Sequence, residues 1–156
     1  MPTFNFVFWK EESGGFLETD GPVIDVEISM PKQLEAWCVK NNLPVPAPVT
    51  GYALIDTGAS ISGIHLPILE QLSLLPIDFI TLQGATGIDD KAPVYPARVS
   101  FPGINLNDVP MSRVVGNQVR YQTPSGKNVI MLLGRDLLKH FNLIYNGTFN
   151  QIILSY

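Results

Sequence analysis

One short stretch organises this sequence: ALIDTGAS, residues 53–60, in which an apolar run ends in a carboxylate followed by small, turn-forming residues. Residues 52–55 predict a short buried strand, and Asp56 follows it directly. Because the end of a buried strand is rigid, a carboxylate there has a fixed position and a pKa that its surroundings can perturb. Taken alone, the triplet Asp56-Thr57-Gly58 also fits a turn at the end of a strand, in which the Asp side chain caps the turn and the Gly takes a positive φ.

A second stretch of the same kind is MLLGRDLL, residues 131–138. Its apolar run predicts another strand, which ends at Gly134 and leads at once into a short helix. Taken alone, it also fits an ordinary strand and a tight glycine, with Asp136 near a helix N-terminus where negative charge is favoured. Between the two stretches, residues 78–101 predict a β-hairpin with its tip at residues 84–91.

The remaining pattern predicts a mainly β chain with short helices. Residues 22–30 alternate apolar and polar side chains with the period of a half-buried strand. Residues 31–41 predict a helix whose apolar face carries Leu34, Trp37 and Cys38. Residues 143–156 predict a hairpin that turns at Asn146-Gly147.

The order of these motifs resembles the retropepsins, the retroviral-type aspartic proteases, and their single-domain cellular and prokaryotic relatives. In that family an Asp-Thr-Gly-Ala loop and an apolar-Gly-Arg-Asn/Asp segment cross in the core, and a Gly-bearing hairpin, the flap, lies between them. Residues 82–88 stand at the flap position. The resemblance covers residues 50–145 and implies a mainly β, closed or orthogonal β-barrel-like fold with one or two short helices, assembled as a homodimer.

The resemblance also implies the roles of individual residues. Asp56 is the catalytic carboxylate, Thr57 bonds across the dimer to the facing loop, and Gly58 permits the tight turn. The other implied site residues are Ala59, Gly84, Ala85 and Gly87 for substrate binding, and Leu133, Gly134, Arg135 and Asp136 for structural support. Among these, Arg135 braces the loop or the dimer through a planar, multi-donor contact.

This chemistry requires two carboxylates about 3 Å apart that share one proton, since like charges that close cannot both ionise. One carboxylate activates a water for attack on the peptide carbonyl, and the other donates a proton to the developing oxyanion. The sequence holds one Asp-Thr-Gly. We therefore expect a symmetric homodimer in which Asp56 of each copy meets on the two-fold axis. The expected substrate is a peptide or protein that is cleaved within an extended, mainly apolar segment.

The sequence departs from the viral pattern at several places. Viral enzymes usually carry an Asp after the Ala, and it pairs with the later Arg; Ser60 stands there, so the partner of Arg135 is open. The flap region carries charges at residues 89–91. Residues 117–127 resemble an insertion. The terminal strand, residues 152–156, fits either of two positions: a sheet shared by two copies of a dimer, or the edge or core of one subunit.

Composition excludes several classes of function. The chain has 156 residues, 15% charged residues and a net charge of -4, which argues against a nucleic-acid module. One cysteine and two histidines make a metal site built on them improbable, and no cofactor is expected. We see no signal-peptide pattern and no apolar run long enough to span a membrane, so a cytoplasmic setting is expected.

We expect a single retropepsin-like domain over residues 1–156, with a core of about 20–156 and an inserted helix and Pro-rich loop at 31–49. Two other functions stay open. One is a catalytically weak or inactive dimer of the same fold that acts as a peptide-binding or scaffold module. The other is an unrelated β-rich protein in which Asp-Thr-Gly occurs by chance.

Overall fold

The computed structural model describes residues 6–10, 17–83 and 89–155. Its strands are β1 (Phe6–Lys10), β2 (Val23–Ser29), β3 (Val49–Ile55), β4 (Gly63–His65), β5 (Asp78–Gln83), β6 (Asp89–Phe101), β7 (Leu106–Asn117), β8 (Tyr121–Gln122), β9 (Asn128–Leu133), β10 (Asn142–Asn146) and β11 (Gln151–Ser155). Its helical segments are α1 (Lys32–Lys40), α2 (Leu66–Gln71), the 3-10 turn η1 (Pro102–Ile104) and α3 (Arg135–Leu138). Over the described residues, no helix is both long and apolar enough to cross a membrane.

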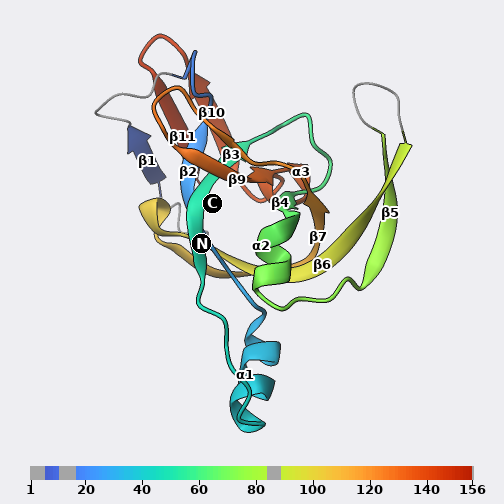
Figure 1. The fold of residues 1–156 in the computed structure, drawn as a ribbon. Coiled ribbons are helices and arrows are strands. Elements are labelled where there is room, and N and C mark those ends of the chain that lie inside the picture. Colours follow the sequence, from blue (N-terminus) through green and yellow to red (C-terminus); the bar gives the residue numbers. More distant parts are fainter. Residues whose placement is uncertain (1–5, 11–16, 84–88, 156) are drawn as a thin grey trace.

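Most strands form a closed barrel (Figure 1). They follow the order β2-β3-β9-β4-β7-β6, and pairing of β2 with β6 closes the ring. β3 with β9 and β4 with β7 are parallel, whereas the other pairs in the ring are antiparallel. Closure gives the backbone groups of these strands partners within the chain. The predicted fold class, a mainly β closed barrel with a few short helices, is confirmed.

The alternation in β2 explains how the barrel is filled. Ile24, Val26 and Ile28 are at most 2% exposed, while Asp25 and Glu27 between them stay half-buried. Successive side chains of a strand point to opposite faces, so this pattern places the three aliphatic side chains in one core. Burial of each contributes roughly 1.5–3 kcal/mol to folding.

The predicted hairpin at residues 78–101 is present as β5 and β6. Its strands pair from Asp78↔Val94 to Gln83↔Asp89, and β6 continues into the barrel wall, where it pairs with β7 and β2. The hairpin therefore extends the wall beyond the ring on one side (Figure 1). The predicted flap residues Gly84, Ala85 and Gly87 lie outside the described residues.

The terminal segments form a second, three-stranded sheet of order β1-β11-β10. β11 lies in the middle, so β1 and β10 of the same chain occupy both of its edges. Of the two interpretations of the terminal strand, the structure therefore supports the one inside a single subunit. Its side chains Ile152 and Leu154 are buried in the same core as the barrel residues.

The hairpin predicted near the end of the chain is present as β10 and β11, but its turn extends beyond the Asn146-Gly147 dipeptide. Asn146 pairs with Gln151, so four residues, 147–150, make the connection. The Asn146 side-chain oxygen accepts a hydrogen bond from Phe149 N at 3.2 Å, and Asn150 takes the positive φ of 51°. An Asn side chain can cap a turn in this way without a type I′ backbone, and the dipeptide alone does not distinguish the two.

α1 projects away from the barrel on the side opposite β10 and β11 (Figure 1). Of its predicted apolar face, Cys38 is 8% exposed, but Trp37 is 54% exposed. The helix therefore buries only a narrow stripe, because it contacts the barrel over a small area. The Pro-rich residues 43–48 return along an extended path, as expected of a segment that lacks amide donors at every second position.

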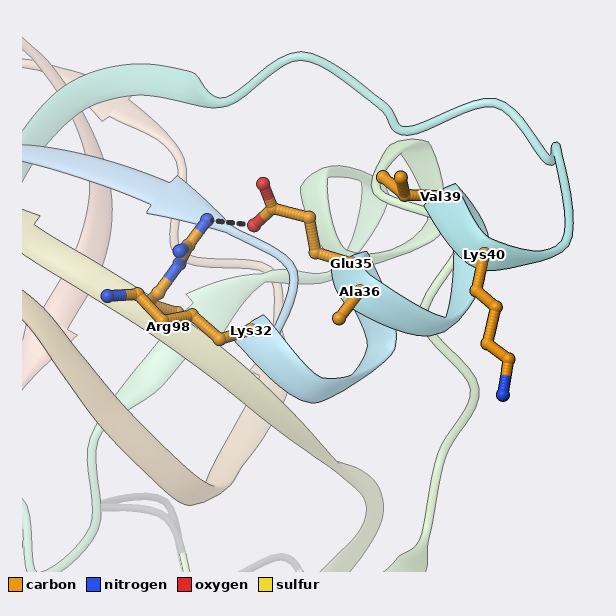
Figure 2. A pocket seen from close by; sticks show the side chains of 6 residues that line it. All are labelled: Lys32, Glu35, Ala36, Val39, Lys40 and Arg98. Carbon is orange, nitrogen blue, oxygen red and sulfur yellow. Dashed lines mark hydrogen bonds and ion pairs between the residues drawn. The ribbon is translucent and has the colours of Figure 1, made fainter.

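The guanidinium of Arg98 fastens α1 to the barrel. It lies in β6 and donates to Ser29 Oγ in β2 (2.9 Å) and to Glu35 Oε2 in α1 (2.6 Å). A third contact reaches Asp108 Oδ1 at 3.3 Å. Figure 2 shows Arg98 and Glu35 meeting across the pocket between the helix and the strand. Arg98 thus fastens α1 through a planar, multi-donor side chain, and Lys32 in the same helix adds an ion pair to Asp108 at 2.7 Å.

Arg98→Met is expected to loosen α1 while the barrel stays folded. The Arg98 side chain is only 15% exposed, so its loss removes three contacts and lowers the free energy of unfolding by about 1 kcal/mol. Amide hydrogen exchange should rise in residues 32–40. The matched control is Arg113→Met, because the Arg113–Asp78 pair is 47% exposed on both sides and should contribute almost nothing. Equal amide exchange in both variants would contradict the role of Arg98 in holding α1 against the barrel.

Candidate active site

The carboxylate of Asp56 has a defined position at the end of β3. The preceding residue, Ile55, is buried, and Asp56 N donates to Leu133 O at 3.0 Å, which continues the β3–β9 pairing into the loop. One carboxylate oxygen, Oδ1, accepts hydrogen bonds from Gly58 N (2.8 Å) and Ala59 N (3.2 Å). Asp56 is half-buried, and Thr57 and Gly58 are exposed. The loop thus presents a carboxylate held by its own backbone.

The second motif crosses this loop and locks it. Ser62 is fully buried; its N and Oγ donate to Asp136 Oδ1 at 3.0 and 2.7 Å, and its Oγ accepts from Gly134 N at 3.0 Å. Arg135 N donates to Ala59 O at 2.9 Å. Residues about 75 positions apart therefore share one hydrogen-bond network. Sequence reasoning missed Ser62, because nothing near it in the chain marks a partner 74 residues away.

The partner of Arg135 is the backbone of the Asp-Thr-Gly loop, not the side chain at position 60. Its Nη1 donates to Thr57 O at 2.6 Å and to Gly58 O at 2.9 Å. These carbonyl oxygens face away from the strand ladder and need donors. An arginine can supply them because its guanidinium carries five N–H groups in a rigid fork. The question left open by Ser60 is resolved in this way.

A pocket of about 410 Å³ opens beside Asp56. It gathers residues from the loop, from the hairpin and from the barrel wall: Asp56, Ala59, Leu82, Val115, Asn117 and Leu132. Of the predicted substrate-binding residues, Ala59 lines this pocket. Leu82, at the described end of β5, shows that the hairpin reaches the same space. A larger volume near α1 is lined by Arg98 and Glu35 and shares no lining residue with the pocket beside Asp56.

The segment between β7 and β9, which resembles an insertion in the sequence, contains a short strand, β8. Tyr121 in β8 pairs with Val129 in β9. Burial raises the pKa of Tyr121, and the negative charges of Asp20 and Asp56 raise it further. Burial lowers the pKa of Lys127, whose ammonium lies 5.5 Å from the ring centre of Tyr52.

No metal centre is assembled from the described residues, since they hold no group of three or more His, Cys, Asp or Glu side chains arranged to hold an ion. Cys38 in α1 is a buried free thiol. Within one copy of the chain, the chemistry at the site therefore depends on a single carboxylate, its two amide donors and the adjoining pocket.

Ser62→Ala is expected to lower the free energy of unfolding by about 2 kcal/mol. The change removes the hydroxyl that accepts from Gly134 N and donates to Asp136, so a buried N–H loses its acceptor and a carboxylate loses one donor. Urea denaturation measures the loss. Ser112→Ala, at an exposed serine of β7, is the matched control and should change stability by less than about 0.5 kcal/mol. Similar values for both variants would contradict a buried network.

No protein-family model and no curated protein sequence matches the chain. Among solved structures, the chain is similar to the simian foamy virus (mac) protease, known from a solution structure, at 18% sequence identity and a TM-score of 0.44. The alignment covers 76% of this chain and 92% of that one. The closed barrel and the crossed loops described above follow from the strand pairing and hydrogen bonds of this chain itself.

Proposed function

We propose that this protein is an aspartic endopeptidase of the retropepsin type, which cleaves extended, mainly apolar peptide segments as a homodimer. One observation carries the proposal: the Asp56 carboxylate stands at the end of a buried strand, held by Gly58 N and Ala59 N, in a loop crossed by the Gly134–Asp136 segment. A chance Asp-Thr-Gly turn would not require this second segment, 72 to 78 residues away, to bond to it.

In the proposed mechanism, Asp56 of each copy lies beside the two-fold axis, and the pair holds one proton. The ionised Asp56 takes a proton from a water, whose oxygen bonds to the peptide carbonyl carbon. The protonated Asp56 of the second copy gives its proton to the carbonyl oxygen. The first Asp56, which now holds the proton of water, gives it to the amide nitrogen, and the second takes a proton from a hydroxyl of the tetrahedral intermediate as the C–N bond breaks. This releases an amine and a carboxylic acid and leaves one proton on the pair.

The geometry of the loop supports these roles. Two backbone N–H groups donate to Asp56 Oδ1 and fix the orientation of the carboxylate. Thr57 is exposed at the loop surface, where its side chain can reach a facing copy. Arg135 braces the loop by its two carbonyl contacts. Position 59 is alanine, so no hydroxyl there competes for the carboxylate.

The pocket supports the choice of an apolar peptide. Leu82, Val115 and Leu132 supply aliphatic surface next to the carboxylate, and Asn117 supplies a polar group. Subsites of this kind take apolar side chains while a few polar groups fix the orientation of the ligand. An extended peptide can also add its backbone to the edge of a hairpin, and the β5 edge stands beside this space.

The test is a peptide library presented to the purified chain between pH 4 and 7, together with its mass in solution by sedimentation. We expect a dimer and cleavage within apolar segments. A protein that stays monomeric at high concentration and cuts nothing would overturn the proposal. A dimer that binds library peptides and releases them intact would favour the peptide-binding or scaffold function instead.

A further inference from the structure

The pocket beside Asp56 contains an amide side chain, that of Asn117 at the end of β7. Asn117 and Val115 stand two positions apart on one face of this strand, and both line the pocket. Gly116 between them faces the other way, because a Cβ there would lie 2.9 Å from the buried ring of Tyr95. The strand therefore brings an aliphatic group and a carboxamide to the same space.

The carboxamide of Asn117 is held in one orientation. Its Oδ1 accepts a hydrogen bond from Val119 N at 3.1 Å, which identifies the oxygen and leaves Nδ2 as the donor end of the group. Among the described residues, no acceptor takes a hydrogen bond from Nδ2. Asn117 is half-buried and lines the pocket, so a ligand that fills the pocket takes water away from this amide. The ligand must then supply an acceptor, or the donor loses its hydrogen bond to water.

Gly63 makes room for this amide. It is buried in β4, where it pairs with Val115 on one side and with Leu132 on the other. A Cβ at position 63 would overlap Asn117 Nδ2. Gly63 does not have a positive φ, so its backbone conformation does not require a glycine. The missing side chain is instead the space in which the amide lies.

The other walls of the pocket restrict which acceptor fits. Leu82, Val115 and Leu132 are aliphatic, so the ligand group needs apolar carbon atoms beside them and an acceptor that meets the amide. Asp56 lines the same pocket, and the pair of Asp56 carboxylates keeps one negative charge in the proposed mechanism. That charge repels a carboxylate in the ligand. An uncharged carboxamide satisfies both conditions.

We propose that Asn117 is a specificity-determining residue, which selects a carboxamide side chain at one position of an otherwise apolar substrate, and that Gly63 is the positioning residue that lets the amide lie in the pocket. This inference rests on the proposed peptidase function. It adds to that function the chemical class of one substrate side chain.

Peptides that carry asparagine, leucine or aspartate at one position, scanned around the cleaved bond, measure this selection, because the three side chains are similar in size. We expect one position at which the wild-type protein prefers asparagine to both alternatives. Asn117→Leu should lower the asparagine-to-leucine ratio of kcat/KM about tenfold at that position, through loss of the hydrogen bond. Gly63→Ala should lower the same ratio, because its Cβ displaces the amide and leaves its chemistry unchanged. Gln118→Leu, at an exposed residue that does not line the pocket, is the matched control and should leave the ratio unchanged.

Binding of the same peptides to Asp56→Asn protein separates this inference from the proposed function. With 15N-labelled asparagine, the side-chain amide of Asn117 gives an NMR signal that Asn117→Leu identifies by its loss. The preferred asparagine peptide should shift this signal, and the matching leucine peptide should shift it much less.

The outcomes distinguish the two proposals. If the wild-type protein cuts peptides but the ratio is the same in Asn117→Leu and Gly63→Ala, the inference is overturned and the peptidase function stands. If the protein binds peptides with the expected preference and cuts none, the peptidase function is overturned and the selection by Asn117 stands. A chain that neither cuts nor binds any peptide overturns both.

Discussion

Asp56→Asn is expected to lower kcat/KM for any cleaved peptide by about 10³-fold or more, because the amide can neither accept the proton of water nor donate one as an acid. Folding should be unaffected. The amide oxygen can still accept the hydrogen bonds from Gly58 N and Ala59 N that the carboxylate oxygen receives. Steady-state cleavage measures the loss of activity, and a thermal melt of both proteins measures whether folding is unchanged. Residual activity equal to wild type would show that the carboxylate is not catalytic.

Mixing the two proteins tests whether the site is shared. If each site needs Asp56 from two copies, a co-refolded mixture of one part wild type and three parts Asp56→Asn contains about one sixteenth all-wild-type dimers. Activity per total protein should fall to about that fraction. A fall to about one quarter would instead mean that each copy carries a complete site.

Gly134→Ala is expected to lower the free energy of unfolding by about 3 kcal/mol. The φ of Gly134 is -88°, which any residue adopts, so the reason is space. A Cβ there would lie 2.7 Å from the Ile61 carbonyl carbon and 2.9 Å from Ser62 N. Both are backbone atoms of the crossing segment, which cannot move aside without breaking the hydrogen bonds of Ser62. Denaturation in urea at one protein concentration measures the change.

Gly147→Ala is the matched control for this substitution. It lies in the turn between β10 and β11, and its Cβ would meet only Tyr145 Cε1 at 3.6 Å, an ordinary contact. We expect a change below about 0.5 kcal/mol. If Gly134→Ala were equally mild, the two motifs would not be packed as tightly as the crossing requires.

The barrel could be predicted from the sequence because its signals are local. The alternation in residues 23–29 and the apolar runs before Asp56 and Gly134 are properties of single strands, and each formed the strand expected. The length of the turn at Asn146-Gly147 could not be predicted, because local signals were not sufficient there. A dipeptide specifies a preference, but the Asn146–Gln151 register selected a four-residue connection.

By itself the sequence determined the chemistry: a carboxylate after a buried strand, a second Gly-Arg-Asp segment, and a hairpin between them. Only the tertiary structure decided which groups these residues bond to. Ser62 joins Asp136, Arg135 joins the carbonyl groups of Thr57 and Gly58, and Asp20 joins Ser125. These contacts span 74 to 105 residues, and their partners include backbone groups that every residue carries. No local pattern encodes such pairs, because the closing of the barrel brings them together.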